Sequence, residues 1–175
     1  MSANELPSKY DPSECEADWY QRWERAGYFR AHADSGRPPF CITIPPPNVT
    51  GEPHMGHAIQ HAIHDAVIRR KRMQGYETLC LPGTDHAGIA TQMMVEEQLA
   101  REEGKTRYDI GREELVKRIW AWREKYGDTI YQQLRKLGAS YDWERSRFTL
   151  DEGYVAAVLT AFKHFQAQGW IYRGT

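Results

Sequence analysis

The sequence has few cysteines, no long apolar run and no excess of charge of one sign. Its three cysteines, Cys15, Cys41 and Cys80, are scattered and form no CxxC pair, which argues against a disulfide framework and against a zinc–thiolate site. No apolar stretch approaches the roughly 20 residues that a membrane span needs, and the polar start lacks the apolar core of a secretory signal. These absences favour a soluble protein of the cytoplasm.

Charge and length narrow the class of protein further. Lys and Arg total 23 against 24 Asp and Glu, so the chain lacks the basic excess that is typical of a polyanion binder. A nucleic acid would therefore have to meet a local patch or a region outside these residues. The 175 residues, of which 41% are hydrophobic, are enough to build one core.

Capping signals and periodicity predict an alternation of helices and strands. Residues 1–9 are polar and are expected to be disordered, and the N-terminal signal at Asp11, Pro12 and Glu14 begins a helix over 11–26. On that helix Trp19 and Trp23 share one face and are expected to pack in a core. The later predicted elements are a buried strand at 40–44, a helix from Pro53 to Gly75, a strand at 78–81, helices at 89–103 and 112–137, a helix from a capping box at Thr149–Glu152 to Gln168, and a strand beginning at Trp170. The first two strands should be parallel, with a right-handed crossover between them.

The segment most indicative of a binding site is the thirteen residues from Pro45 to His57, where the end of a strand, a turn and the start of a helix are predicted in succession. In an open α/β sheet, ligands bind beyond the carboxyl ends of the strands. The free N–H groups of the helix start, together with His54 and His57 three residues apart, can donate to phosphate oxygens. Gly56 removes a side chain where a flat nucleotide could approach. The segment therefore predicts a nucleotide-phosphate site.

A metal site is the alternative, because one helix carries four histidines: His54, His57, His61 and His64. No cysteine accompanies them, and Asp65 is the only carboxylate on that helix, so a closed zinc site would depend on other groups. We therefore expect no metal there, and expect His61 and His64 to be ordinary packing or solvent residues.

Two motifs resemble those of a known family. His54-Met55-Gly56-His57 resembles the HIGH signature of class I aminoacyl-tRNA synthetases, and the segment Leu81–Gln92 (LPGTDHAGIATQ) is similar to that of the valyl enzymes in particular. Other stretches agree with the family: Tyr10-Asp11-Pro12, Trp19 to Phe29, Arg69 to Tyr76, and Ser140 to Trp143 with Arg145 and Phe148-Thr149. The resemblance therefore covers nearly the whole chain from residue 10.

The resemblance implies a fold and a domain organisation. The fold class would be α/β, the first half of the Rossmann (HUP-like) parallel sheet of a class I synthetase, with an N-terminal helix and additional helices. Residues 10–175 would form the N-terminal half of the catalytic domain, truncated before the editing insertion.

The resemblance also implies roles for individual residues. His54 and His57 would be catalytic, binding ATP together with Gly56 and stabilising charge on its phosphates. The valine pocket would be lined by Pro45, Pro46 and Asn48, while Asp85 would pair with the ammonium group of valine. A carboxylate at a strand end suits a primary ammonium ion. From the residues alone, a helix cap near Ala87 is the alternative role for Asp85, and both readings stay open.

The implied partners are valine, ATP with Mg²⁺ bridging its phosphates, and tRNA-Val, in an enzyme that is monomeric at full length and has no membrane contact. Pro53 departs from the family, in which leucine is more usual before the first histidine, but proline is well tolerated at a first helical position. No chemistry can be assigned to Asp142, Trp143 and Arg145, which are expected to be structural.

The KMSKS signature of the family does not occur in these residues, which leaves two other hypotheses open. The chain could be a catalytically incomplete nucleotide-binding fragment, or another HxGH nucleotidyl transferase that acts on a small acid. The valyl-like segment after Leu81 argues against the second. Measurable adenylate formation would argue against the first.

The sheet predicted for this chain would have an exposed edge, and an uncovered strand edge is a template for pairing with another chain. We therefore expect poor solubility or self-association. Gel filtration checks this prediction, and a clean monomer would contradict it.

Overall fold

The computed structural model describes residues 8–51 and 53–174. Residues 1–7, the larger part of the segment expected to be disordered, lie outside the described residues. Among the described residues, no helix is long and apolar enough to cross a membrane.

The N-terminal region is helical as predicted, but it forms two short elements. Asp11 caps a 3₁₀ helix, η1 (Pro12–Glu14), by accepting a hydrogen bond from the backbone N–H of Ser13, and α1 (Glu16–Arg25) follows after Cys15. Tyr20, which is buried, ties α1 to the rest of the protein because its hydroxyl donates to the carbonyl of Ala139 at 2.7 Å. The expectation that both tryptophans pack in a core is wrong for Trp19, which is 51% exposed, because Tyr20 takes the buried position.

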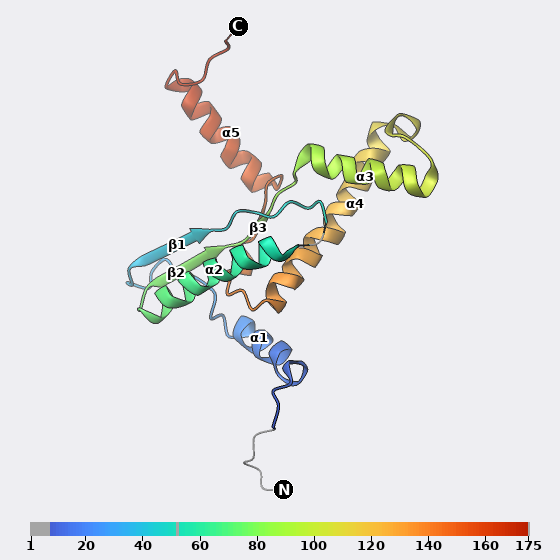
Figure 1. The fold of residues 1–175 in the computed structure, drawn as a ribbon. Coiled ribbons are helices and arrows are strands. Elements are labelled where there is room, and N and C mark those ends of the chain that lie inside the picture. The colour runs from blue at the N-terminus through green and yellow to red at the C-terminus, as the bar shows by residue number, and fades with distance from the viewer. Residues whose placement is uncertain (1–7, 52, 175) are drawn as a thin grey trace.

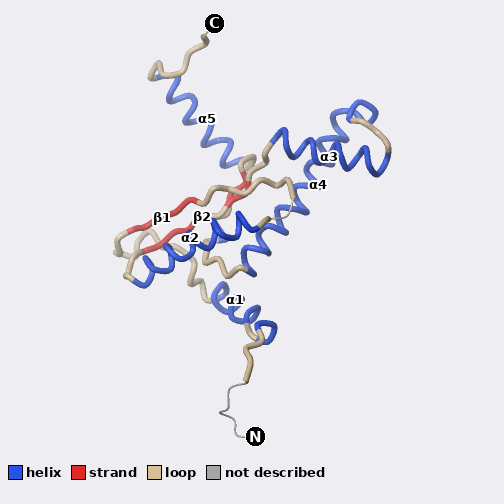
Figure 2. Tube along the Cα trace, in the orientation of Figure 1, coloured by secondary structure: helices blue, strands red, loops and turns tan. Residues whose placement is uncertain are grey.

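The parallel pairing of the first two strands is confirmed. The strands β1 (Pro39–Thr43) and β2 (Glu77–Leu81) are joined by α2 (Met55–Met73), and Ile42 of β1 lies opposite Cys80 of β2. The helix α2 runs alongside this pair (Figure 1 and Figure 2). The prediction of a buried first strand is wrong: β1 alternates exposed and half-buried residues, because in the described part of the chain only one face of β1 is covered.

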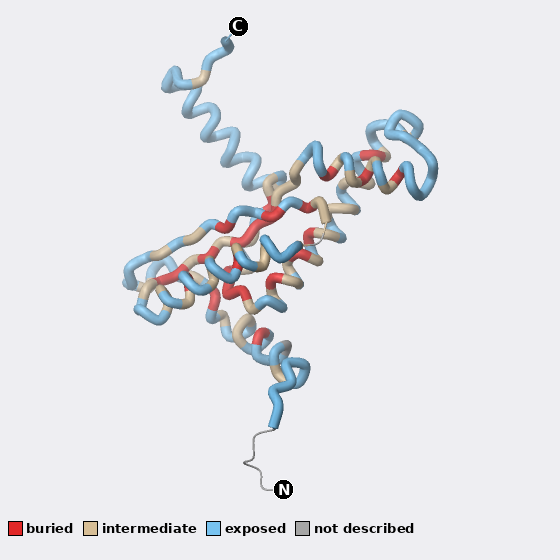
Figure 3. The backbone as a smooth tube through the Cα atoms, in the orientation of Figure 1, coloured by how far each residue is buried: buried red, intermediate tan, exposed pale blue. Residues whose placement is uncertain are grey.

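The apolar spacing that predicts α2 does not mark its buried face. Much of this helix is exposed or half-buried (Figure 3). The large apolar residues Met55, Ile59, Ile63, Val67 and Met73 are exposed, whereas Ile68 and His61 are buried. The inner side of α2 is instead largely polar, and it binds the turn at 138–141 through hydrogen bonds.

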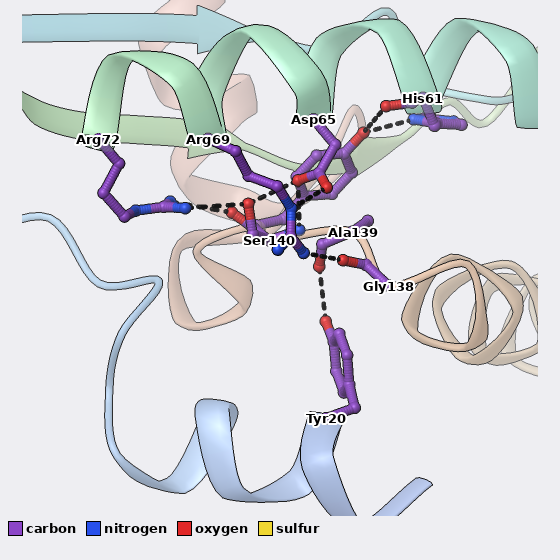
Figure 4. A network of polar contacts seen from close by, with 9 residues as sticks. Tyr20, His61, Asp65, Arg69, Arg72, Gly138, Ala139 and Ser140 are labelled. Atoms are coloured by element: carbon purple, nitrogen blue, oxygen red, sulfur yellow. Dashed lines mark hydrogen bonds and ion pairs between the residues drawn. The ribbon is translucent and has the colours of Figure 1, made fainter. Parts of the chain in front are cut away.

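This polar contact joins α2 to a segment about 75 residues further along the chain (Figure 4). The carboxylate of Asp65 accepts from the backbone N–H of Ser140 at 2.7 Å and from its hydroxyl at 2.5 Å. Arg69 pairs with Asp65 at 2.5 Å and donates to the carbonyl of Gly138 at 2.6 Å. The hydroxyl of Tyr141 lies 2.8 Å from Nδ1 of His61. These bonds fix the orientation of α2 and hence of its N-terminus.

A second pair of strands, which no sequence pattern predicted, is formed by β3 (Gly83–Thr84) and β4 (Arg147–Phe148), again in parallel. Gly83 is required there because a Cβ atom on it would lie 2.8 Å from the carbonyl oxygen of Arg147. Between these strands come α3 (Gly88–Glu103), α4 (Arg107–Lys136) and the 3₁₀ helix η2 (Trp143–Arg145). The break at Gly111 in α4, with φ of 75°, explains why the sequence predicts the helix only from residue 112.

The C-terminal helix α5 (Glu152–Ala167) projects away from the other elements (Figure 1). Its cap is the side chain of Asp151, which accepts from the N–H of Tyr154; the predicted capping box at Thr149 is wrong, because the Thr149 hydroxyl bonds elsewhere. The strand predicted from Trp170 is also wrong, since residues 170–174 form no strand and the ring of Trp170 stacks on Phe165.

The core lies between α2, the strands and α4. It is made by Ile44, Val49, Ile68, Cys80, Ile130, Leu134, Ala139 and Tyr141. Asp142 is buried beside this core, where it accepts a hydrogen bond from the N–H of Ala31 and pairs with Arg145. Trp143 donates its indole N–H to the hydroxyl of Tyr20. These contacts agree with the structural role expected for all three residues.

The burial of His61 makes stability depend on pH. Burial, with smaller contributions from the charges of His64 and His57, lowers the pKa of His61 from 6.5 to about 4. The unfolded chain takes up a proton near pH 6.5, whereas the folded chain does so only near pH 4, so this stabilisation is complete above pH 6.5 and is lost as the pH falls towards 4. The loss should reach about 3 kcal/mol. Urea unfolding across this range should show a steeper decline for the wild type than for His61→Gln, and parallel curves would contradict the prediction.

Candidate functional site

The two histidines of the HIGH-like motif form a reciprocal cap at the start of α2. His54 is the N-cap residue, and its ring Nδ1 accepts from the N–H of Gly56 at 3.1 Å. The backbone N–H of His54 in turn donates to Nδ1 of His57 at 3.2 Å. The two rings lie side by side with centroids 4.1 Å apart.

The cap determines which ring nitrogen carries the proton. Because both Nδ1 atoms accept hydrogen bonds, each neutral ring carries its proton on Nε2, where it is a donor. Partial burial, and then the charge of His54, lower the pKa of His57 below its ordinary value, so His57 is neutral at pH 7. The helix start therefore presents two imidazole N–H donors in addition to its own backbone N–H groups.

The cap formed by His54 requires a glycine at position 56. A Cβ atom there would lie 2.9 Å from Cε1 of the His54 ring. A side chain at this position would therefore displace the ring that caps the helix. Pro53 stands before the N-cap and outside α2, which corrects the expectation that it occupies the first helical position.

The candidate amino-acid residues lie on two neighbouring segments that follow β1 and β2. Asn48 and Asp85 pair as an isolated parallel bridge: the N–H of Val49 donates to the carbonyl of Asp85 at 3.0 Å, and the N–H of Asp85 donates to the carbonyl of Pro47 at 2.9 Å. Pro47 and Val49 are buried, whereas Pro45, Pro46 and Asn48 are exposed. The structure thus places Asn48 next to Asp85.

Asp85 makes one local and one long-range contact, but its alternative role as a helix cap is wrong, because the N-cap of α3 is Ala87 and no side chain caps this helix. Oδ1 of Asp85 accepts from the N–H of Ala87 at 3.1 Å, next to the start of α3, and from the hydroxyl of Thr149 at 3.0 Å. The side chain is 36% exposed. The sequence patterns did not single out Thr149 as part of this site, because they assigned it to the cap of α5 and it lies 64 residues away.

One cavity of the protein lies away from these residues. It measures about 1090 Å³, lies between α1 and the C-terminal end of α4, and is lined by residues that include Trp19, Trp23, Arg69 and Arg135. None of the candidate site residues lines it. Among the described residues, no three His, Cys, Asp or Glu side chains are placed to share a metal ion.

Comparison with known proteins gives the class. The sequence profile "tRNA synthetases class I (I, L, M and V)" matches residues 18–175. A LeuRS–tRNA–LeuAMS ternary complex of Agrobacterium radiobacter K84 has a similar fold, with a TM-score of 0.76 and 23% identity over 95% of this chain and 19% of that one. The chain belongs to the class I tRNA synthetases, and the predicted α/β fold of that class is confirmed.

Within the class, the similar proteins are valine–tRNA ligases. Those of Corynebacterium efficiens and Carboxydothermus hydrogenoformans are 55% and 57% identical over 98% and 96% of the chain. The mitochondrial valine–tRNA ligase 1 of Arabidopsis thaliana is 52% identical over 98% of it. The predicted resemblance to the valyl enzymes is confirmed. The chain spans 19% of the length of the two bacterial relatives and 15% of the plant one.

Proposed function

We propose that this chain carries the ATP- and valine-binding residues of a valine–tRNA ligase, which forms valyl-adenylate and transfers valine to tRNA-Val. The observation that carries the proposal is the arrangement of two segments after adjacent parallel strands. One leads to a helix start with two N–H donors, and the other presents a carboxylate. The similarity to valine–tRNA ligases supports valine as the amino acid.

The ATP half of the site comprises His54, Gly56 and His57. In the proposed reaction a carboxylate oxygen of valine attacks the α-phosphorus of ATP, the bond to pyrophosphate breaks, and valyl-adenylate remains. The Nε2–H groups of His54 and His57 donate to phosphate oxygens as negative charge builds up on them, which is electrostatic stabilisation without proton transfer.

The valine half comprises Pro45, Pro46, Asn48 and Asp85. The exposed proline rings offer apolar contacts to a short branched side chain. Asp85 offers its carboxylate to the ammonium group, in a charge-assisted hydrogen bond. Asn48 lies beside Asp85 across the bridge and adds a polar group to the same edge.

Magnesium would enter with the nucleotide. Because the described residues offer no cluster of three ligands, the site fits a cation held mainly by phosphate oxygens and water, as Mg²⁺ usually is. Bound there, it would neutralise phosphate charge. We further propose that tRNA-Val binds mainly through parts of the ligase outside these residues, and that the whole enzyme is a cytoplasmic monomer.

Valine-dependent exchange of labelled pyrophosphate into ATP tests the proposal, with threonine and isoleucine as competing acids. Exchange that prefers valine supports it. ATP binding measured by calorimetry without any exchange would instead favour the second candidate, a catalytically incomplete nucleotide-binding fragment. That candidate rests on the sequence of these residues, in which no KMSKS motif occurs.

A further inference from the structure

Thr149 is held beside the predicted ammonium-binding carboxylate by the backbone. Its N–H donates to the carbonyl of Thr84 at 3.2 Å, which continues the pairing of β3 with β4 by one residue. Thr84 immediately precedes Asp85. The position of Thr149 therefore depends on a strand pair, and a strand pair is a rigid support for a side chain that orients another.

The hydrogen-bonding groups around the Thr149 hydroxyl define its direction. The backbone N–H of His86 donates to its oxygen at 2.9 Å, and the ring Nδ1 of His86 lies 2.5 Å from the same oxygen. An ionised Asp85 can only accept, so the single hydroxyl proton points to Oδ1 of Asp85 at 3.0 Å. The Nδ1 of His86 must then be protonated and donate to the second lone pair of the hydroxyl.

The two oxygens of Asp85 are consequently unequal. Oδ1 already accepts from Thr149 and from the N–H of Ala87, and Nδ1 of His86 lies 3.3 Å from it. Within residues 8–51 and 53–174, Oδ2 accepts no hydrogen bond. We propose that Thr149 is a positioning residue for the amino-acid substrate: it holds Oδ1 so that Oδ2 is left to receive the substrate ammonium group. This inference rests on the proposed function.

Changing Thr149 to valine keeps the shape of the side chain but removes the donor and the acceptor. The carboxylate of Asp85 then loses one of its two neutral donors and is free to turn about its own side-chain bond. We expect the dissociation constant for valine to rise about tenfold, since a hydrogen bond to a charged group contributes at least that much. ATP does not contact Asp85 in the proposed site, so its dissociation constant should stay the same.

Calorimetry of the full chain with valine and, separately, with ATP measures this split. Thr149→Ser keeps the hydroxyl and should restore valine affinity to within about twofold of the wild type. Thr160→Val is the matched control, because the Thr160 hydroxyl donates only to a carbonyl within α5. This variant should bind both ligands normally. Equal loss of both ligands in Thr149→Val, or no loss of valine, would overturn the role of Thr149.

Nitrogen NMR of the His86 ring gives a readout that needs no substrate. The wild type should show the proton on Nδ1, which faces both the Thr149 hydroxyl and Oδ1 of Asp85. A proton on Nε2 in the wild type would overturn the hydrogen-bond assignment. If the wild type shows the proton on Nδ1 but binds no valine, the proposed function fails together with the substrate role. If it binds valine and the variant binds equally well, only the role of Thr149 fails.

Discussion

Replacing His57 with alanine is expected to lower valine-dependent pyrophosphate exchange by roughly 10²- to 10³-fold. The substitution removes one of two N–H donors at the helix start, and the loss of one such donor from a site of developing charge has an effect of this size. It also removes the acceptor for the backbone N–H of His54. Exchange rates at saturating valine and ATP measure the effect.

A second variant separates these two losses. In His57→Asn the amide oxygen can take the place of Nδ1 and keep the cap, but the side chain is too short to replace Nε2–H. If the donor matters, His57→Asn should be nearly as inactive as His57→Ala. Near-normal exchange in His57→Asn would mean that the histidine serves only the cap. His164→Ala, on the exposed helix α5, is the matched control and should exchange normally.

Replacing Asp65 with alanine is expected to lower the free energy of unfolding by about 4 kcal/mol. The change leaves the buried N–H and hydroxyl of Ser140 without an acceptor and leaves Arg69 without its partner charge. Each buried donor that is left without an acceptor costs about 1–3 kcal/mol, whereas the ion pair adds little because the Arg69 side chain is 39% exposed. Urea denaturation at neutral pH measures it.

Asp65→Asn keeps one acceptor oxygen and should cost only about 1–2 kcal/mol, since a hydrogen bond survives and only the charge is lost. Asp128→Ala is the control, because Asp128 is exposed on α4. Equal stability of all three variants would show that the polar contact between α2 and the 138–141 turn contributes little.

The exposed apolar residues add a reason for the expected self-association. Besides the apolar side of α2, the helix α5 exposes a group of large apolar side chains: Tyr154, Val155, Val158, Leu159, Phe162 and Phe165. Contiguous apolar surface of this kind promotes association between protein chains. Gel filtration of the chain therefore tests both this surface and the exposed edge of the sheet.

The sequence by itself determined the features that depend on residues close together in the chain. The helices, the strands β1 and β2 and the family follow from short patterns, because caps, periodicity and motifs act over a few positions. The parallel pairing of β1 and β2 follows from the helix between them. The cap formed by His54 and His57 is local in the same sense, since the two residues are three positions apart.

Only the tertiary structure decided which groups meet across the chain. The sequence could not show that His61 is buried against Tyr141, 80 residues away, or that the apolar side of α2 is exposed. It assigned Thr149 to a helix cap, the usual local role of its residue type, whereas the β3–β4 pair carries it to Asp85. Hydrogen bonds between distant segments depend on how strands pair and helices pack, and no pattern within a few residues contains that information.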